Sequence, residues 1–218
     1  MGLFIVFEGI EGSGKTTQIK KAGEFLTDRK IPFIVTSEPG GTRLGKELRT
    51  LLLHKTSFPL GVRAELLLFA ADRAQHVDEI ILPALKEGKV VLCDRFSDAT
   101  IAYQGYGREW EIDCVAKISE FASRSLKPDV TFLLDVPVDT GLRRVLSRTS
   151  QCAIHGRSEE KLDDRFEKEN MSFHKRVREG YLSLADNEPK RFRVIDGLME
   201  IDEIHRKICA SLLELIGR

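Results

Sequence analysis

The sequence predicts an α/β fold in which a five-stranded parallel sheet is flanked by helices on both faces. Short apolar runs rich in β-branched residues recur along the chain, and they have the length and composition of strands buried on both faces. Longer stretches with helical periodicity separate these runs. Because strand and helix alternate throughout, we expect the strands to run parallel.

The apolar runs give the expected strands, which are Leu3–Phe7, Phe33–Thr36, Val90–Cys93, Val130–Leu134 and Phe192–Ile195. The helical stretches are Gly14–Asp28, Arg43–His54, Val62–Lys86, Ile112–Arg124, Asp139–Arg148, Lys161–Ala185 and Glu200–Ile216. No Ser/Gly/Pro-rich linker or internal repeat divides them, so residues 1–218 are expected to form one domain. The segment 149–160 is polar and lacks periodicity, which is typical of a surface loop or a short lid.

Composition excludes several classes of function. Of the 218 residues, 42% are hydrophobic and 31% are charged, the balance of a soluble globular protein. Lys plus Arg and Asp plus Glu both number 34, so no overall positive charge exists to attract a nucleic acid polymer or a membrane surface. The amino-terminal segment lacks the features of a signal peptide, and no apolar run is long enough to span a bilayer. We therefore expect a soluble, cytoplasmic protein.

The segment Gly9–Thr16 carries the strongest functional signal. It reads Gly9, Ile10, Glu11, Gly12, Ser13, Gly14, Lys15, Thr16. This order fits the P-loop pattern GxxxxGK[ST], and the segment stands between an apolar strand and a helix, as that motif requires. A P-loop turns backbone N–H groups toward one anion, and the amino terminus of the following helix adds partial positive charge. A glycine-rich turn that merely packs well is the alternative interpretation.

The P-loop predicts the fold class of a P-loop NTPase and an ATP site formed by residues 9–17, ending at Thr17. Lys15 is expected to reach the β and γ phosphates, and the Thr16 hydroxyl to bind Mg²⁺. A second metal ligand is expected at Asp94, which follows the strand Val90–Cys93. The carboxyl ends of parallel strands face the ligand crevice, so Asp94 is placed to bind Mg²⁺ directly or through water. An ordinary surface Asp-Arg pair is the alternative.

The four variable positions of the P-loop contain no basic residue, so the charge of a transferred phosphoryl group requires arginines from elsewhere. Four arginines lie on and around the segment 149–160, namely Arg144, Arg148, Arg157 and Arg165. They are close enough in sequence to act together when a lid closes over the phosphates. For any one of them, a solvated basic face is an equally good interpretation.

The helix expected from Val62 carries a candidate base pocket. Phe69 and Arg73 stand at positions i and i+4, so they share one helix face. An aromatic ring can stack on a base, and a guanidinium group can donate to a base carbonyl. Helical spacing alone favours a core phenylalanine and a surface arginine in an ion pair. The sequence has no Asn-Lys-x-Asp motif for reading guanine, which disfavours a regulatory GTPase.

At this point the chain resembles the bacterial thymidylate kinases, which belong to the P-loop nucleoside monophosphate kinases, and the likeness extends over nearly the whole chain. Beyond the P-loop it rests on Glu38-Pro39-Gly40-Gly41-Thr42, Arg49, Phe69 to Arg73, Asp94-Arg95-Phe96, Ala102-Tyr103-Gln104-Gly105 and Asp164-Arg165-Phe166-Glu167. The first and the last of these segments discriminate best, because generic P-loop proteins lack both. Two features depart from the family pattern. Ala99 stands where many relatives carry serine, and the stretch Arg148–Arg165 is longer than usual.

The resemblance implies transfer of the ATP γ-phosphoryl group to dTMP, giving dTDP and ADP for dTTP synthesis, with Mg²⁺ as cofactor. It implies that dTMP is bound by Glu11, Glu38, Pro39, Arg49, Phe69, Arg73, Arg95, Thr100, Tyr103 and Gln104. Phe69 would stack on thymine and Arg73 would donate to its O4. Thr100 and Gln104 would approach the remaining base edge.

The resemblance also implies roles around the sugar and the phosphates. Arg49 and Arg95 would hold the acceptor phosphate, since two guanidinium groups suit a dianion. Tyr103 would crowd the sugar 2′ position and Glu11 would contact the 3′-hydroxyl. The catalytic residues would be Lys15, Arg95, Arg148, Arg157 and Arg165. A homodimer is implied as well, formed through long helices that include Leu66–Leu68 and Ile80–Leu82.

The phosphate of a nucleoside monophosphate is already largely ionised near neutrality, because its second pKa is about 6. No general base is needed, and we expect direct in-line transfer without a covalent intermediate. Two other functions stay open. A deoxynucleoside kinase would phosphorylate a 5′-hydroxyl with Glu38 as its base, but its paired arginines would then have no phosphate to hold. A nucleotide-dependent switch would lack a base pocket separate from the ATP site.

Overall fold

The computed structural model of the protein describes residues 2–53, 58–154, 165–167 and 169–217. Its strands are β1 (Phe4–Glu8), β2 (Phe33–Ser37), β3 (Val90–Asp94), β4 (Val130–Asp135) and β5 (Phe192–Asp196). They form one parallel sheet in the order β2-β3-β1-β4-β5. The α/β fold class and all five expected strands are confirmed, and each strand ends one residue later than the sequence indicated.

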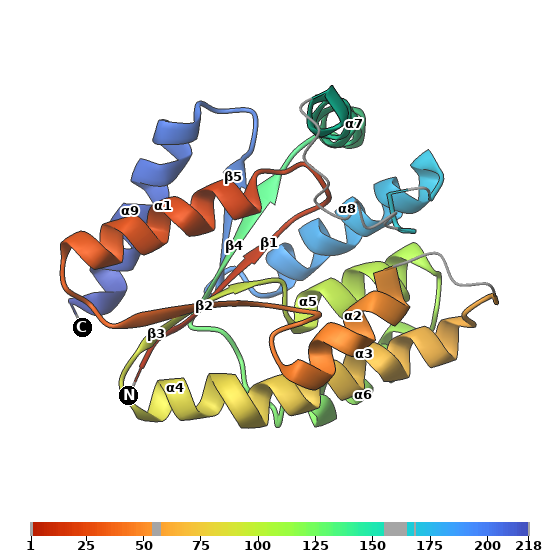
Figure 1. Cartoon of the computed structure of the whole chain (residues 1–218), viewed down its shortest axis with the longest axis horizontal. Helices are drawn as coiled ribbons and strands as arrows, with labels where there is room; N and C mark the ends of the chain where they lie inside the picture. The colour runs from red at the N-terminus through yellow and green to blue at the C-terminus, as the bar shows by residue number, and fades with distance from the viewer. Residues whose placement is uncertain (1, 54–57, 155–164, 168, 218) are drawn as a thin grey trace.

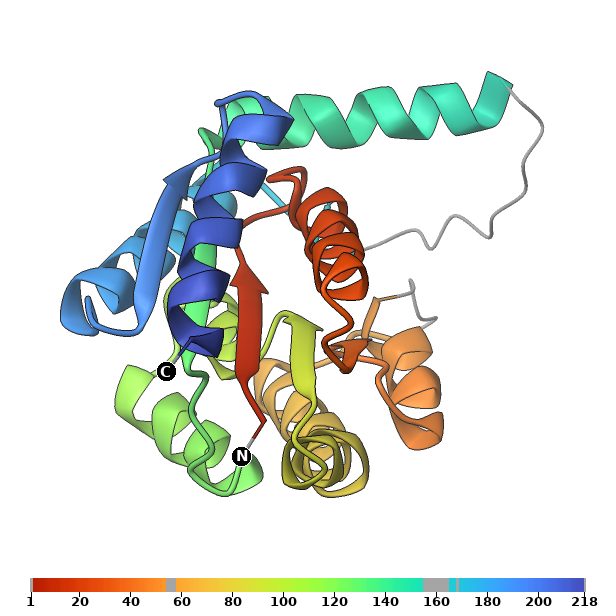
Figure 2. The same cartoon turned by 90° about the vertical axis from the view of Figure 1, so that its left-hand side faces the viewer.

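The helices follow the strands in alternation and cover both faces of the sheet (Figure 1). They are α1 (Lys15–Asp28), α2 (Arg43–Leu53), α3 (Val62–His76), α4 (Leu82–Lys86), α5 (Ser97–Thr100), α6 (Ile112–Ala122), α7 (Val138–Ile154), α8 (Met171–Asn187) and α9 (Ile201–Ile216), with π-helical segments η1 (Val77–Ile81) and η2 (Ile101–Gly107). Helices α1 and α9 lie together on one face, and η1 with α4 covers the opposite one (Figure 2). None of the described helices combines the length and apolarity that crossing a bilayer requires.

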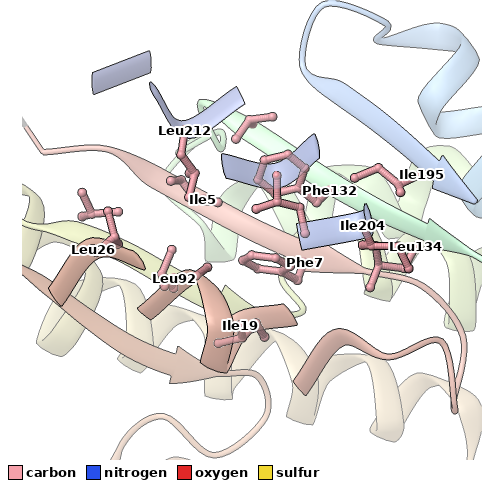
Figure 3. Packing of buried hydrophobic residues seen from close by; sticks show 14 residues of the cluster. Ile5, Phe7, Ile19, Leu26, Leu92, Phe132, Leu134, Ile195, Ile204 and Leu212 are labelled. Atoms are coloured by element: carbon pink, nitrogen blue, oxygen red, sulfur yellow. The ribbon is translucent and has the colours of Figure 1, made fainter. Parts of the chain in front are cut away.

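The main core lies between the sheet and the pair α1 and α9. Figure 3 shows how side chains from the central strands, such as Phe7 and Phe132, meet Ile19 of α1 and Ile204 of α9. Every residue of β1 is buried. This continuous burial explains why the central strands read as unbroken apolar runs.

The two edge strands differ from the expectation that all strands are buried on both faces. Val35 of β2 is 55% exposed and Val194 of β5 is 52% exposed. Both strands have a neighbour on one side only. Apolar sequence runs alone do not distinguish an edge strand from a central one, because only the strand order determines which faces the helices cover.

The structure corrects three expected helices. The stretch Val62–Lys86 is interrupted by the π-helical segment η1. Within the expected helix Lys161–Ala185, the described residues 165–167 form a turn, and helix α8 begins at Met171, where the Asn170 side chain accepts from the Phe173 N–H (2.8 Å). Residues 97–107 are helical although no helix was expected there. Helix α7 continues to Ile154, so residues 149–154 of the expected irregular lid are helical, and the rest of that segment lies outside the described residues.

Burial within the sheet gives a first prediction. Val91 of β3 is fully buried, whereas Val35 of the neighbouring strand β2 is largely exposed. We expect Val91→Ala to lower the free energy of unfolding by about 2 kcal/mol, through lost apolar burial and the cavity left behind. The matched change Val35→Ala should cost less than about 1 kcal/mol. Urea unfolding followed by circular dichroism measures both, and equal costs would contradict this description of the sheet.

Candidate active site

The loop between β1 and α1 has the geometry of an anion site. Gly12 and Gly14 adopt φ angles of 74° and 100°, in the left-handed region that favours glycine. A Cβ at Gly12 would also clash with the carbonyl group of Gly141, so this glycine allows α7 to pack against the loop. Gly14 is the N-cap of α1 and supplies no side-chain cap. The first N–H groups of the helix therefore stay available to a phosphate.

Lys15 is the first residue of α1, and its side chain folds back over the loop. Its Nζ donates to the carbonyl oxygens of Gly9 (3.0 Å) and Ile10 (3.2 Å). Burial, together with the neighbouring positive charge of Arg95, lowers the pKa of Lys15 to about 8. A bound phosphate would favour the charged form, so nucleotide binding is expected to raise that pKa again.

A cavity of about 350 Å³ opens beside this loop, at the carboxyl ends of β1, β2 and β3. Its size lies within the range of small-molecule sites. Six residues of the expected ATP loop line it, namely Glu11, Gly12, Gly14, Lys15, Thr16 and Thr17. The residues expected at the acceptor site also line it, namely Glu38, Pro39, Arg49, Phe69, Arg73, Arg95, Thr100, Tyr103 and Gln104. Asp94 lines it as well, whereas Gly9, Ile10 and Ser13 do not. One cavity thus joins the two sets of residues.

Arg95 links the two halves of the cavity. It follows β3 with a φ of 68°, an uncommon angle for a residue other than glycine. Its Nη2 donates to Glu11 Oε1 (2.9 Å) and its Nη1 to the Tyr181 hydroxyl (2.9 Å). The guanidinium carbon lies 4.9 Å from the centre of the Tyr103 ring, and the Tyr103 hydroxyl donates to the same Glu11 oxygen. These contacts fix one arginine from three different elements.

Two glutamates near Arg95 have pKa values that are shifted in opposite directions. Glu8 accepts from the Phe96 N–H (2.9 Å) and the Tyr181 hydroxyl (2.7 Å), and burial raises its pKa to about 7 despite the nearby Arg95. Burial alone would also raise the pKa of Glu11. His174, Arg95 and Lys15 outweigh burial and hold that pKa well below its usual range. Glu11 is therefore a carboxylate at neutral pH, while Glu8 exchanges a proton close to neutrality.

Arg73 is fully buried (1% exposed), unlike the surface ion pair that helical spacing alone favours. Its Nε donates to Glu38 (2.9 Å), its Nη2 to Thr100 (2.9 Å) and its Nη1 to Ser119 (3.0 Å). Glu38 is shared with the His76 ring, 2.9 Å away. The Glu38 loop and helix α3 therefore form one hydrogen-bonded wall of the cavity.

Thr16 and Asp94 provide the kind of ligands that Mg²⁺ prefers, a hydroxyl and a carboxylate oxygen. Both line the cavity, and no donor within the described part of the chain meets the Asp94 carboxylate. Among the described residues there is no cluster of three or more metal-binding side chains. The site therefore fits a magnesium ion whose remaining ligands are phosphate oxygens and water, as is usual for this ion.

Comparisons with known proteins agree with this geometry. The family model described as thymidylate kinase matches residues 7–208. The chain belongs to the thymidylate kinase family. It is 49% identical over 212 residues to a thymidylate kinase of Syntrophus aciditrophicus, covering 97% of this chain and 94% of the relative. It is 47% identical over 218 residues to one from Geobacter sulfurreducens, covering both chains completely. The crystal structure of thymidylate kinase from Ehrlichia chaffeensis superimposes with a TM-score of 0.73 at 33% identity, covering 97% of this chain and 98% of that one.

The arginines expected from the lid of this kinase family have different positions. Arg165 does not line the cavity; its Nε donates to the Leu52 carbonyl (2.6 Å) and its Nη2 to Glu65. The expectation that Arg165 reaches the phosphates is not met in this arrangement, because the buried Glu65 carboxylate holds its guanidinium group. Arg144 Nη1 donates to the Gly197 carbonyl (3.1 Å) and, more weakly, to the carbonyl of the P-loop residue Gly12 (3.4 Å). The side chain of Arg148 and the whole of Arg157 lie outside the described residues.

Sequence reasoning missed several residues of the site. Phe166 lines the cavity, 6.2 Å from Phe69 between ring centres, and the Asp-Arg-Phe-Glu segment was the available signal. Tyr181 and His174 of α8 contact Arg95 and Glu11, with His174 Nδ1 3.6 Å from the carboxylate. Nothing local in the α8 sequence indicates these contacts, because their partners are more than 80 residues away.

A pH-dependent stability follows from Asp72, which neighbours Arg73 and is buried. Its Oδ1 accepts from the Gly40 N–H (3.1 Å), and its Oδ2 has no hydrogen-bond partner within the described residues. Burial, and then the charge of Glu38, raise the pKa of Asp72 to about 6. A carboxyl group with a raised native pKa contributes stability below its unfolded pKa, and that contribution is lost as the pH rises through about 6.

We therefore expect Asp72→Asn to raise the free energy of unfolding by about 2 kcal/mol at pH 7.5 and to change it little at pH 4.5. Urea titrations at the two pH values measure the difference. The exposed Asp186 provides a control, since Asp186→Asn should have no such pH-dependent effect. A destabilisation by Asp72→Asn at pH 7.5 would contradict the assignment.

Proposed function

We propose that this chain transfers the γ-phosphoryl group of ATP to dTMP, giving dTDP and ADP, and that the cavity beside the P-loop is its active site. The observation that supports this most strongly is the continuity of the cavity. The phosphate-binding loop lies at one side, and a separate aromatic and arginine pocket lies at the other. A donor and an acceptor nucleotide can therefore meet in one space. Family membership supplies the identity of the acceptor.

On the acceptor side, Phe69 is proposed to stack on thymine and Arg73 to donate to O4, with Thr100 and Gln104 at the remaining base edge. Arg49 and Arg95 are proposed to hold the 5′-phosphate. Arg49 donates to the Pro39 carbonyl (2.7 Å), which places its guanidinium group on the cavity wall together with Glu38 and Pro39. Tyr103 would lie against C2′ of the sugar, and Glu11 beside its 3′-hydroxyl.

On the donor side, residues 9–17 are proposed to bind the ATP phosphates, with Lys15 neutralising charge on the transferred group. Thr16 and Asp94 would hold Mg²⁺, which supplies positive charge to the triphosphate. The acceptor phosphate is ionised near neutrality, so positioning and charge neutralisation suffice for direct in-line transfer. Arg95 would contribute from the described residues, and Arg148 and Arg157 from the lid. Trapping of a phosphorylated enzyme would contradict this mechanism.

A deoxynucleoside kinase is disfavoured by the surroundings of Glu38. That function would use Glu38 as a free carboxylate base. Instead, both of its oxygens are engaged, one by Arg73 and the other by the His76 ring. The carboxylate thus acts as a structural partner of Arg73 in this arrangement.

We also propose that the chain acts in the cytoplasm as a homodimer. The expected contact runs through the helices that include Leu66–Leu68 and Ile80–Leu82, and within these segments the side chains of Leu66 and Ile81 are buried in the core. Leu67 is 58% exposed, and Ala64 and Ala71 are exposed at i−3 and i+4 on the same helix face. This face is the proposed contact. Sedimentation velocity should find a dimer, and Leu67→Glu should shift it toward monomer; a monomeric wild-type chain would contradict the proposal.

The experiment that tests the function is a coupled assay with ATP and a panel of acceptors. dTMP should be phosphorylated, whereas thymidine should not. If thymidine accepts phosphate better than dTMP, the chain is a deoxynucleoside kinase. If no nucleoside monophosphate binds or accepts phosphate, a nucleotide-dependent switch is the better description.

A further prediction separates the acceptor side from the donor side. Arg49→Gln should raise the KM for dTMP by about 10-fold to 100-fold and leave the KM for ATP nearly unchanged, because it removes one guanidinium contact to the acceptor phosphate. Lys15→Met is the matched change on the donor side, and it should reduce kcat at least about 1000-fold. Steady-state kinetics with each substrate varied in turn measures both. Equal effects of Arg49→Gln on the two KM values would show that the acceptor phosphate lies elsewhere.

A further inference from the structure

We propose that Glu65 is a positioning residue that determines base specificity. It orients the Gln104 side-chain amide so that the carbonyl oxygen faces the cavity, and the site therefore selects a pyrimidine with an N–H at ring position 3. The inference rests on the proposed function, since it states which edge of the acceptor base the site reads.

Glu65 is a buried carboxylate (1% exposed) on α3, surrounded by N–H donors. Its Oε1 accepts from Gln104 Nε2 (2.8 Å) and from Arg108 Nε (3.3 Å). Its Oε2 accepts from Arg165 Nη2 and, more weakly, from Arg108 Nη2 (3.4 Å). Two guanidinium groups thus balance the charge and hold the carboxylate in one orientation.

These contacts of the Glu65 carboxylate determine which end of the Gln104 amide faces it. A carboxylate that already binds two guanidinium groups has only acceptors to offer, whereas an amide has a donating NH₂ end and an accepting carbonyl end. If the amide were turned around, two oxygens would face each other in a buried environment and the NH₂ group would lose its partner. Glu65 therefore holds the NH₂ group toward its own carboxylate, and the carbonyl oxygen points away from Glu65, toward the cavity.

Gln104 lines the cavity, and no donor within the described part of the chain meets its carbonyl oxygen. A base that displaces water from the cavity must supply that donor. Arg73 lines the same cavity and has one N–H on Nη1 that no described acceptor engages. The pocket thus offers an acceptor from Gln104 and a donor from Arg73.

This pair matches the edge of thymine and uracil, which present an N3–H donor next to an O4 acceptor. Cytosine presents an N3 acceptor next to an amino donor, so both contacts would be mismatched. Rejection by an unpaired or repelling group is stronger than rejection by shape alone. Glu65 would therefore exclude cytidine nucleotides without touching them.

The test compares kcat/KM for dUMP and dCMP with ATP. These two acceptors both lack the thymine methyl group and differ only at ring positions 3 and 4. The wild-type chain should prefer dUMP. Glu65→Gln should reduce the ratio of the two kcat/KM values by about tenfold or more, because a neutral amide accepts either orientation of Gln104. Gln104→Leu, which leaves Glu65 paired with both arginines, should reduce the ratio similarly.

The double variant shows whether Glu65 acts through Gln104. In a Gln104→Leu background, Glu65→Gln should have no further effect on the ratio. Asp98→Asn is the control, since Asp98 is another buried carboxylate, paired with Arg191 (2.6 Å), that does not line the cavity. It should lower the melting temperature and leave the ratio unchanged, which separates loss of stability from loss of specificity.

The inference is overturned if folded Glu65→Gln keeps the wild-type ratio, or if its effect persists undiminished without Gln104. Should Glu65→Gln fail to fold, Gln104→Leu decides, and an unchanged ratio in that variant refutes the orientation argument. A wild-type chain that phosphorylates dTMP but prefers dCMP to dUMP also refutes it. A wild-type chain that does not phosphorylate dTMP at all refutes the proposed function instead.

Discussion

The contact between Arg95 and Glu11 is the interaction on which the arrangement of the site depends. It joins the end of β3 to the P-loop, and Tyr103 and Tyr181 complete it from η2 and α8. A site for two polyanions needs buried positive charge, but an unpaired buried charge is costly before any ligand binds. Glu11 supplies the counter-charge, and its lowered pKa keeps it ionised. Under the proposed function, the acceptor phosphate would share the guanidinium group that Glu11 already orients.

Pairing of a buried carboxylate with an arginine recurs around the proposed acceptor pocket. Arg73 is held by Glu38, and Arg165 with Arg108 by Glu65. In each case the carboxylate fixes a guanidinium group in one position, and hydrogen bonds beyond the ion pair define its rotation. These pairs contribute little net stability, since desolvation offsets most of their attraction. Their value lies in orientation, which matters where donors and acceptors must match one base edge.

Local patterns were enough to predict the parts of the site that depend on contiguous sequence. The P-loop and the five strands follow from runs of a few residues. Family motifs indicated Arg49, Thr100 and Gln104 as substrate-binding residues, and all three line the cavity. The helix over residues 97–107 was missed, because Gly105 and Gly107 and its lack of a clear apolar stripe obscure helical periodicity. Arg165 was expected at the phosphates because it follows the lid segment in sequence, whereas its guanidinium group donates to Glu65, 100 residues away. Ion pairs between distant segments leave no local pattern to read.

Asp94 bears on how a chain without net charge can bind two highly charged ligands. The described cavity wall carries Lys15, Arg49, Arg73 and Arg95 against Glu11, Glu38 and Asp94. Glu11 and Glu38 are already bound to arginines, so neither repels a ligand strongly. Asp94 has no such donor among the described residues, and by itself it would disfavour phosphate groups nearby. A cation between that carboxylate and the phosphates would remove the conflict, which supports the proposal that Thr16 and Asp94 hold Mg²⁺.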